Sequence, residues 1–248
     1  MKITIITVSY NSASTIKDTF DSIRIQNYNN IEYIVVDGGS IDETISIIEN
    51  NNDIISNWIS EKDNGIFDAF NKGIALASGD IVGILNSDDF YTNKNVISDV
   101  IKAFSDYKVD SVYGNLLYTD SVNTNIIKRK WIDKTPYDRN KFKYGWMPAH
   151  PTFFVKKTKY KLYGLFNTSL RGGGDYELML RFLFKYKISS YHIPKILVRM
   201  RAGGNSNSSI KNRLRGIKDD VNAWKVNDLK HNYFISAMKI IRKFKQFY

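Results

Sequence analysis

Residues 78–91, SGDIVGILNSDDFY, decide the fold, because a short apolar run there enters a polar cluster. The run at 81–85 is continuous and is bounded by turn-forming residues, which is typical of a strand inside a parallel sheet. The cluster at 86–89 would lie at the carboxyl end of that strand, where open α/β sheets bind ligands. Asp88 and Asp89 repel one another unless a divalent cation shares them with phosphate oxygens. A polar turn that caps the next helix is an equally good interpretation of this stretch alone.

Strand and helix patterns alternate around this stretch. Apolar, β-branched runs predict strands at 3–8, 31–36 and 54–60, and helices are predicted at about 15–24, 43–49 and 66–77. Such alternation is typical of βαβ units with parallel strands. Polar loops follow the strands, so we expect these loops to meet at one edge of the sheet.

The second half of the chain is less regular. Helices are predicted at 96–104 and from 171–175 to about 186, and strands at 110–118, 152–155, 188–193 and 195–199. Residues 128–143 are basic and aromatic, 201–209 are typical of a loop, and the chain is predicted to be helical from Ile210 onward. We therefore expect one domain over 1–209 and a helical extension over 210–248.

The composition narrows the class of function. The chain has 248 residues, 43% of them hydrophobic, which suffices for one large α/β domain. It has no cysteine, which excludes disulfides, thiol nucleophiles and thiolate metal ligands and is in keeping with a reducing compartment. The net charge of +11 predicts anionic partners such as nucleotide phosphates, nucleic acid or an anionic membrane surface. We expect neither a signal peptide nor a spanning helix, since no apolar run approaches about 20 residues.

The phosphate-binding loops of two common nucleotide folds are missing. The first strand is not followed by Gly-x-Gly-x-x-Gly, and there is no Gly-Lys-Ser/Thr loop. A nucleotide here would need its phosphates held otherwise, and a metal at Asp88 would do so. Asp37, at the end of the second strand, is suited to accept hydrogen bonds from a base or from ribose hydroxyls. A turn residue before Gly38 is the alternative for Asp37.

Six short motifs in order give the chain a resemblance to family 2 glycosyltransferases with the GT-A fold. They are TVSYN at 7–11, VDGGSIDET at 36–44, EKDNGIFDAFNKG at 61–73, ASGD at 77–80, LNSDD at 85–89 and GDYE at 174–177. The resemblance spans about residues 3–207 and is closest to bacterial transferases that build exopolysaccharide and O-antigen repeat units, such as the colanic acid transferases. It implies an α/β fold with a Rossmann-like, mixed but mainly parallel sheet flanked by helices.

The resemblance also implies a nucleotide-sugar site. The residues that would bind the donor are Val8, Ser9, Tyr10, Asn11, Asp37, Asn64, Asp68, Asn71, Lys72, Asn86, Ser87 and Asp88. Asp88 would be the metal-binding carboxylate of an Asp-x-Asp motif, with Mg²⁺ or Mn²⁺ as the cofactor. The chain departs from that motif at Asn86, which replaces the first Asp. One carboxylate together with a diphosphate can still hold such an ion.

Asp175 occupies the position of the general base in these enzymes. An acidic residue usually precedes it, but Gly174 does so here. A base that takes the proton of an acceptor hydroxyl while nucleoside diphosphate leaves implies inversion at the anomeric carbon. The alternative role for Asp175 is to cap the helix that begins after the glycines.

Three basic residues are weaker candidates for an acceptor or phosphate site. His150 lies in Ala149-His150-Pro151, which resembles a recurring family segment near the acceptor, although a packed structural histidine fits as well. Arg199 and Arg201 precede a Gly/Asn/Ser-rich loop and could bind a pyrophosphate, or they could be solvated.

The C-terminal segment has an amphipathic pattern. On a helical projection, one side holds Phe234, Met238, Ile241, Phe244 and Tyr248, and the other holds Lys239, Arg242 and Lys243. A basic amphipathic helix is typical of binding to an anionic membrane surface. The alternative is an ordinary helix packed on the domain with a solvated basic face.

The resemblance, together with the basic C-terminal segment, implies an inverting, metal-dependent transferase. We expect a UDP-hexose or UDP-N-acetylhexosamine donor, a lipid-linked saccharide acceptor, no nucleic acid partner, and a cytoplasmic location at the inner face of a bacterial cell membrane. A sugar-phosphate nucleotidyltransferase would instead want a Gly-rich basic loop after the first strand, and residues 9–14 lack one. A non-catalytic module that binds carbohydrate or nucleic acid is the other alternative, suggested by the net charge and the aromatics of 128–146.

Overall fold

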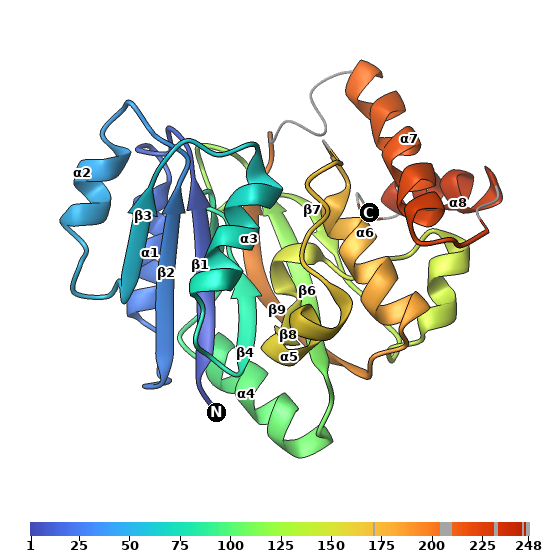
Figure 1. Ribbon diagram of the computed structural model, residues 1–248, viewed down its shortest axis with the longest axis horizontal. Coiled ribbons are helices and arrows are strands. Elements are labelled where there is room, and N and C mark those ends of the chain that lie inside the picture. Colours follow the sequence, from blue (N-terminus) through green and yellow to red (C-terminus); the bar gives the residue numbers. More distant parts are fainter. Residues whose placement is uncertain (171, 204–209, 231–232, 245, 247–248) are drawn as a thin grey trace.

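The computed structural model describes residues 1–170, 172–203, 210–230, 233–244 and 246 (Figure 1). Over these residues it contains a nine-stranded sheet in the order β3-β2-β1-β4-β8-β6-β9-β5, with β7 paired to β6. The predicted boundary between 209 and 210, and residues 204–209 of the predicted loop, lie outside the described residues.

The N-terminal half of the sheet is parallel. Its strands are β1 (Ile3–Ser9), β2 (Ile31–Asp37), β3 (Asn57–Ser60) and β4 (Ile81–Ile84). The connecting helices are α1 (Ile16–Arg24), α2 (Thr44–Glu49) and α3 (Ile66–Leu76). Ser9 pairs with Asp37 and Ile6 pairs with Ile84, so these strands end at the same edge. The predicted meeting of the strand-end loops is therefore confirmed.

The C-terminal half makes the sheet mixed, as predicted. It holds β5 (Asp89–Tyr91), β6 (Ser111–Thr119), β7 (Ile127–Trp131), β8 (Phe154–Lys156) and β9 (Ser190–Arg201). Strand β8 is antiparallel to both β4 and β6, whereas β6 and β9 are parallel. The helical segments are α4 (Val96–Tyr107), η1 (Arg139–Tyr144), η2 (His150–Thr152), α5 (Lys157–Tyr163), α6 (Gly174–Met179) and the π-helical η3 (Leu180–Lys185).

The prediction of two strands at 188–193 and 195–199 is wrong, because β9 is continuous. The register against β6 shifts between the pairs Tyr113–His192 and Asn115–Ile196. This irregularity contains Pro194, which has no N–H to donate to a ladder and is tolerated at bulges. The short elements β5, β7 and α5 were not predicted, because their polar and basic residues hide the periodicity.

The apolar side chains of β1 alternate between the two faces of the sheet and so contribute to two hydrophobic cores, one on each face. Ile6 and Val8 pack in a cluster with residues of α3 and α6, whereas Ile3 and Ile5 pack with residues of α1 and α4. The period of two follows from the pleat of the strand, which sends successive side chains to opposite faces. Both faces are therefore covered by helices, as an interior parallel strand requires.

The C-terminal extension packs on the first of these cores. It consists of α7 (Ile210–Val226) and α8 (Tyr233–Phe244), at the upper right of Figure 1. Ala223, Trp224 and Ile235 belong to the same cluster as Ile6. The indole Nε1 of Trp224 donates a 2.8 Å hydrogen bond to the hydroxyl of Tyr176 on α6. Within the described residues, no helix combines the length and apolarity needed to cross a membrane.

The alternative of a helix packed on the domain agrees with the structure, since Ile235 is buried in the core, but its solvated basic face is not found for the residues that can be placed. Lys239 Nζ pairs with Asp220 and lies 3.7 Å from the ring centroid of Tyr176, and Arg242 Nε donates 2.8 Å to the carbonyl of Tyr144. The close approach depends on Gly145 (φ 67°), where a Cβ would lie 2.3 Å from Lys239 N. The basic side therefore contacts the domain.

The other side of α8 faces outward. Phe234 and Ile241 of the predicted apolar stripe are 51% and 47% exposed. Met238 is half-buried. The side chains of Lys243 and Phe244, and all of Tyr248, lie outside what the structure describes.

Candidate active site

The polar cluster after β4 is held against the first helix. Ser87 Oγ and Ser12 Oγ are 2.8 Å apart, and Thr19 Oγ1 donates 2.7 Å to the carbonyl of Asp89. Thr19 and Asp89 are fully buried, and Ser87 is buried. The loop that follows β1 and the Asn86–Asp89 cluster therefore form one surface at the carboxyl ends of β1 and β4.

Asp37 organises the loop after β2. Its carboxylate is fully buried and accepts hydrogen bonds from Ser9 Oγ (3.0 Å), Ser60 Oγ (2.8 Å), Gly39 N (3.0 Å), and the N (2.8 Å) and Oγ (2.5 Å) of Ser40. These five donors occupy both oxygens. Direct binding of a nucleotide by Asp37 stays a prediction, and it requires one of the serine hydroxyls to turn away.

The Tyr10–Asn11 pair lies at the rim of the same loop. Tyr10 is 63% exposed. Asn11 adopts φ 48°, a left-handed conformation that asparagine tolerates. Its Oδ1 accepts 2.9 Å from Ile41 N, and its own N donates 2.8 Å to Ser40 Oγ. Tyr10 is thus available to a ligand, whereas Val8 is buried in the core.

The start of α3 carries a group of charged residues. Asp68 Oδ2 accepts 3.0 Å from Asn64 N and lies 3.6 Å from Lys72 Nζ. Lys72 Nζ also lies 2.8 Å from Glu61 Oε1, and this contact is the largest cause of its raised pKa. These three predicted residues therefore lie together beside the donor loops.

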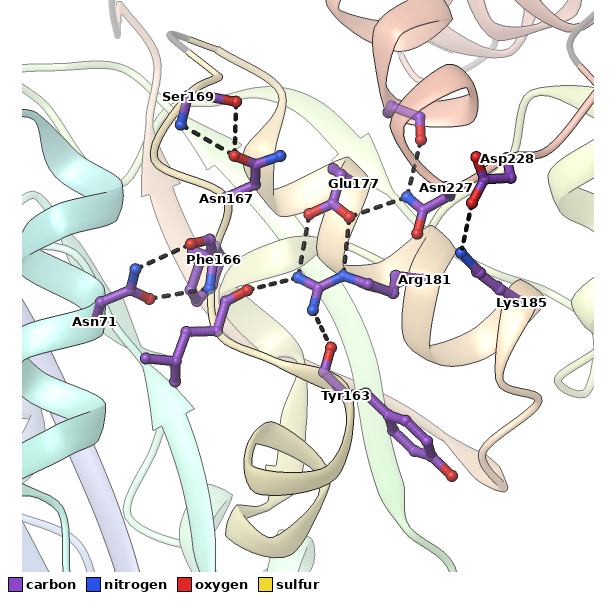
Figure 2. A network of polar contacts seen from close by, with 12 residues as sticks. Asn71, Tyr163, Phe166, Asn167, Ser169, Glu177, Arg181, Lys185, Asn227 and Asp228 are labelled. Carbon is purple, nitrogen blue, oxygen red and sulfur yellow. Dashed lines mark hydrogen bonds and ion pairs between the residues drawn. The ribbon is translucent and has the colours of Figure 1, made fainter.

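Asn71 has a different position, which Figure 2 shows. Its amide donates 2.9 Å to the carbonyl of Phe166 and accepts 2.9 Å from Phe166 N. Both amide atoms are thus used to hold the segment after α5. A donor contact by Asn71 stays a prediction, and its observed contacts are structural.

The Asn86–Asp89 cluster contains buried oxygens without protein partners. Burial raises the pKa of Asp88, against the opposing effect of Arg201 and His150. Burial, and next the charge of Asp88, raise the pKa of Asp89 well above its usual range. Asn86 Oδ1 and Asp89 Oδ1 are buried and have no hydrogen-bond partner among the described residues. Buried polar atoms are normally paired, so these oxygens fit a cation or a donor that this cluster would bind.

The protein offers few ligands of its own to such an ion. Among the described residues, no group of three or more His, Cys, Asp or Glu side chains is placed to hold a metal. Asp88, Asp89 and the amide oxygen of Asn86 would be the protein's share. A hard divalent cation commonly completes so small a set with substrate phosphates and water.

Asp175 faces His150 across the site. Its Oδ2 lies 3.1 Å from His150 Nδ1, and the two side chains are 29% and 28% exposed, so a substrate can reach both. The alternative of a helix cap is wrong, because Gly173 is the cap of α6 and Asp175 is its second residue. Packing explains why position 174 is a glycine, since a Cβ there would lie 2.7 Å from ring carbons of Phe67. No acidic side chain therefore fits before Asp175.

Arg201 holds the backbone of the cluster. Its guanidinium donates 2.8 Å to the carbonyl of Asp88 and pairs with Asp18 of α1. The residue is 7% exposed, so the alternative of a solvated arginine is wrong. Arg199 Nη1 lies 3.5 Å from the carbonyl of Thr124, and its Nε is buried without a partner among the described residues.

Tyr118 and Arg129 belong to this surface but were not predicted as site residues. Burial raises the pKa of Tyr118 to about 12, Arg129 lowers it, and the carboxylates of Asp89 and Asp175 raise it. Arg129 Cζ lies 3.6 Å from the Tyr118 ring centroid. Tyr118 is thus within electrostatic reach of both ends of the site. The basic run at 128–130 was a visible pattern, but β7 had to be recognised to show that Arg129 points inward.

The fold and this edge define a class of protein, the nucleotide-sugar transferases with the GT-A fold. Residues 4–163, more than half of the chain, match the family "Glycosyl transferase family 2". The chain therefore belongs to that family.

Relatives and solved structures agree with this class. An uncharacterized glycosyltransferase of Mycobacterium tuberculosis is 38% identical over 104 residues, which cover 42% of this chain and 40% of that protein. A Mycobacterium bovis "PGL/p-HBAD biosynthesis glycosyltransferase" is 28% identical over 71% of this chain and 68% of its own.

Among solved structures, S. aureus TarS 1-349 in complex with UDP-GlcNAc has a TM-score of 0.73 at 18% identity, over 99% of this chain and 73% of that one. Mannosyltransferase PcManGT from Pyrobaculum calidifontis, in complex with GDP-Man and Mn²⁺, has a TM-score of 0.68 at 19% identity, over 98% of this chain and 69% of that one. At such identities the likeness shows the fold.

Proposed function

We propose that the protein transfers a hexose or N-acetylhexosamine from a nucleotide sugar, with UDP as the nucleotide, to a hydroxyl of a saccharide acceptor. The observation that carries the proposal is the pairing of Asp175 with His150 at 3.1 Å, together with a half-buried Asp88 that is within electrostatic reach of His150. Glycosyl transfer needs a base for the acceptor hydroxyl and a group that stabilises the departing diphosphate, and Asp175 and Asp88 would supply these two functions at the same edge of the sheet. The UDP-GlcNAc complex of the structurally similar TarS supports the choice of nucleotide.

The donor would lie across the loops after β1, β2 and β4. The exposed ring of Tyr10 can stack on a base, and Ser12 and Ser87 bring the first and last of these loops together. Lys72, beside Glu61 and Asp68, gives a cation at the edge of the same surface. The diphosphate would face Asp88.

The unpaired oxygens of Asn86 and Asp89, with Asp88, fit Mg²⁺ or Mn²⁺. When bound, such an ion would neutralise charge on the departing nucleoside diphosphate. Arg201 holds the Asp88 backbone, so it would fix the position of these ligands. The Mn²⁺ in the PcManGT complex supports a divalent cofactor.

Asp175 would act as general base. It takes the proton of the acceptor hydroxyl, the oxygen forms a bond to the anomeric carbon, and the bond from that carbon to the phosphate oxygen breaks, with its electron pair leaving on the diphosphate. One displacement of this kind inverts the anomeric carbon. His150 would orient the carboxylate through its Nδ1, so we assign it as a positioning residue.

The acceptor would be a lipid-linked saccharide of surface polysaccharide, used at the inner face of the cell membrane. The net charge of +11 and the exposed apolar side of α8 support a membrane surface as partner.

A panel of nucleotide sugars tests this function. UDP- and GDP-linked sugars would be incubated with the protein and MgCl₂ or MnCl₂, and released nucleoside diphosphate would be measured. We expect turnover of one UDP-sugar, lost in excess chelator and in Asp88→Ala. Absence of release with every sugar, together with salt-sensitive oligonucleotide binding, would support a binding module instead.

A further inference from the structure

A cavity lies between the C-terminal helices and the domain, apart from the nucleotide loops. Its volume is about 330 Å³, near the lower end of the range of roughly 300–1,000 Å³ for ligand pockets. It is lined by Lys143 of η1, Phe184 of η3, Trp224 of α7, Leu229 and Lys230 of the segment after α7, and Ile235 of α8. Figure 1 shows α7 and α8 standing over α6 on this side of the molecule.

The lining combines apolar walls with two cations. Phe184, Trp224, Leu229 and Ile235 form the apolar part. Neither lysine is in an ion pair within the described part of the chain. Asp220 pairs with Lys239, and Asp228 lies 3.5 Å from Lys185. An apolar cavity with two exposed lysines that form no ion pair with any described residue is complementary to a hydrocarbon chain that carries an anionic head group.

Two exposed aromatic residues are sequence neighbours of lining residues, since Tyr144 follows Lys143 and Phe234 precedes Ile235. Tyr144 and Phe234 are each 51% exposed, and their rings meet edge to face with centroids 6.2 Å apart. Tyrosine is enriched where protein meets the interfacial region of a membrane, and phenylalanine adds apolar area there. The cavity therefore adjoins the part of the surface best suited to contact lipid.

The wall of the cavity is tied to the helix that carries Asp175. Trp224 Nε1 bonds to the hydroxyl of Tyr176, the residue after Asp175. Asn227 Nδ2 donates 2.9 Å to Glu177, which also binds Arg181 at 2.8 Å (Figure 2). Glu177 and Asn227 are each 2% exposed, so this connection is buried. A ligand in the cavity would thus be held in a fixed relation to the acceptor side of the site.

We propose that this cavity binds the lipid end of the acceptor, a hydrocarbon chain joined to phosphate, and places the attached saccharide toward Asp175. The phosphate would lie between Lys143 and Lys230 and the chain would lie against Trp224 and Ile235. The assignment rests on the proposed transfer to a lipid-linked acceptor, but the binding itself can be measured without turnover.

Binding of decyl phosphate below its micellar concentration, measured by calorimetry, tests the site. Decyl maltoside, with the same chain and a neutral head, is the reference ligand. We expect Lys143→Gln/Lys230→Gln to weaken decyl phosphate binding roughly tenfold or more and to change decyl maltoside binding little. Lys94→Gln/Lys161→Gln removes the same charge from exposed positions away from the cavity and should leave the affinity unchanged. Equal weakening by both pairs would overturn the site.

Two further arms identify the source of the lipid. Vesicles of phosphatidylcholine with 30% phosphatidylglycerol should compete poorly with decyl phosphate, and strong competition would assign the cavity to bulk membrane lipid instead. In Lys143→Gln/Lys230→Gln, the kcat/KM for a lipid-diphosphate-linked saccharide should fall relative to that for a short water-soluble glycoside. An unchanged ratio would contradict the assignment. Phosphate-dependent binding without any transfer would preserve the site and reject the proposed function.

Discussion

His150 Nδ1 lies 3.1 Å from Asp175 Oδ2, although the two residues come from different elements, η2 and α6. The contact directs the carboxylate into the site and leaves its other oxygen for an acceptor. His150→Gln should therefore lower kcat roughly tenfold through loss of orientation, with little change in the KM for the donor. Steady-state kinetics with varied donor measure this. A change confined to the donor KM would instead place His150 at the nucleotide.

Gly174 is required by packing against Phe67. Because a Cβ would lie 2.7 Å from the ring, Gly174→Ala should destabilise the fold by about 1–3 kcal/mol. Gly216→Ala is the matched control, since nothing lies within 4 Å of a Cβ there and alanine favours the helix. Chemical denaturation compares the two, and equal stability of both variants would contradict the packing argument.

Glu32 is a buried carboxylate at the amino end of β2, away from the site, and it makes the stability of the fold depend on pH. Burial alone would raise the pKa of Glu32, but hydrogen bonds from Lys2, Ser78 and Thr4 outweigh it and lower the pKa to about 2. A folded-state pKa below the unfolded value near 4.5 means stability that is present above that value and is lost as pH falls toward 2. Glu32→Gln should therefore cost roughly 1–3 kcal/mol at pH 7 and progressively less below about pH 4.5.

Denaturation midpoints at several pH values test the Glu32 prediction. Glu49→Gln, at an exposed position of α2, is the control and should match the wild type throughout. A pH-independent loss in Glu32→Gln would indicate a packing defect rather than a lost charge.

The exposed side of α8 should contact lipid. Truncation would remove the buried Ile235 and the Lys239–Asp220 pair, so point changes at the surface are the cleaner test. Phe234→Ser/Ile241→Ser should weaken binding to anionic vesicles by roughly tenfold or more, because apolar area no longer enters the interface. Val122→Ser/Leu162→Ser changes side chains that are 91% and 67% exposed elsewhere, and it should sediment with vesicles like the wild type.

The strand ends could be predicted because apolar runs that stop at polar residues are local features. Asp88, Asp175 and the loop after β1 follow from such runs and from the motif order. The contact of Arg201 with Asp18 could not be found, because it joins residues 183 positions apart through the pairing of β9 with β5. A helical projection gave two sides for α8 but could not say which one packs. The packing side is determined by residues outside α8. Gly145 leaves room for the α8 backbone at Lys239, and Tyr176 and Asp220 contact the Lys239 side chain.

Asp175→Asn decides whether Asp175 is the base of a glycosyl transfer. The change keeps the shape of the side chain, and the cap of α6 is Gly173. We predict that kcat falls roughly 10²-fold or more, while the affinity for UDP and the melting temperature stay at wild-type values. Wild-type turnover per folded molecule in Asp175→Asn would show that Asp175 is not the base.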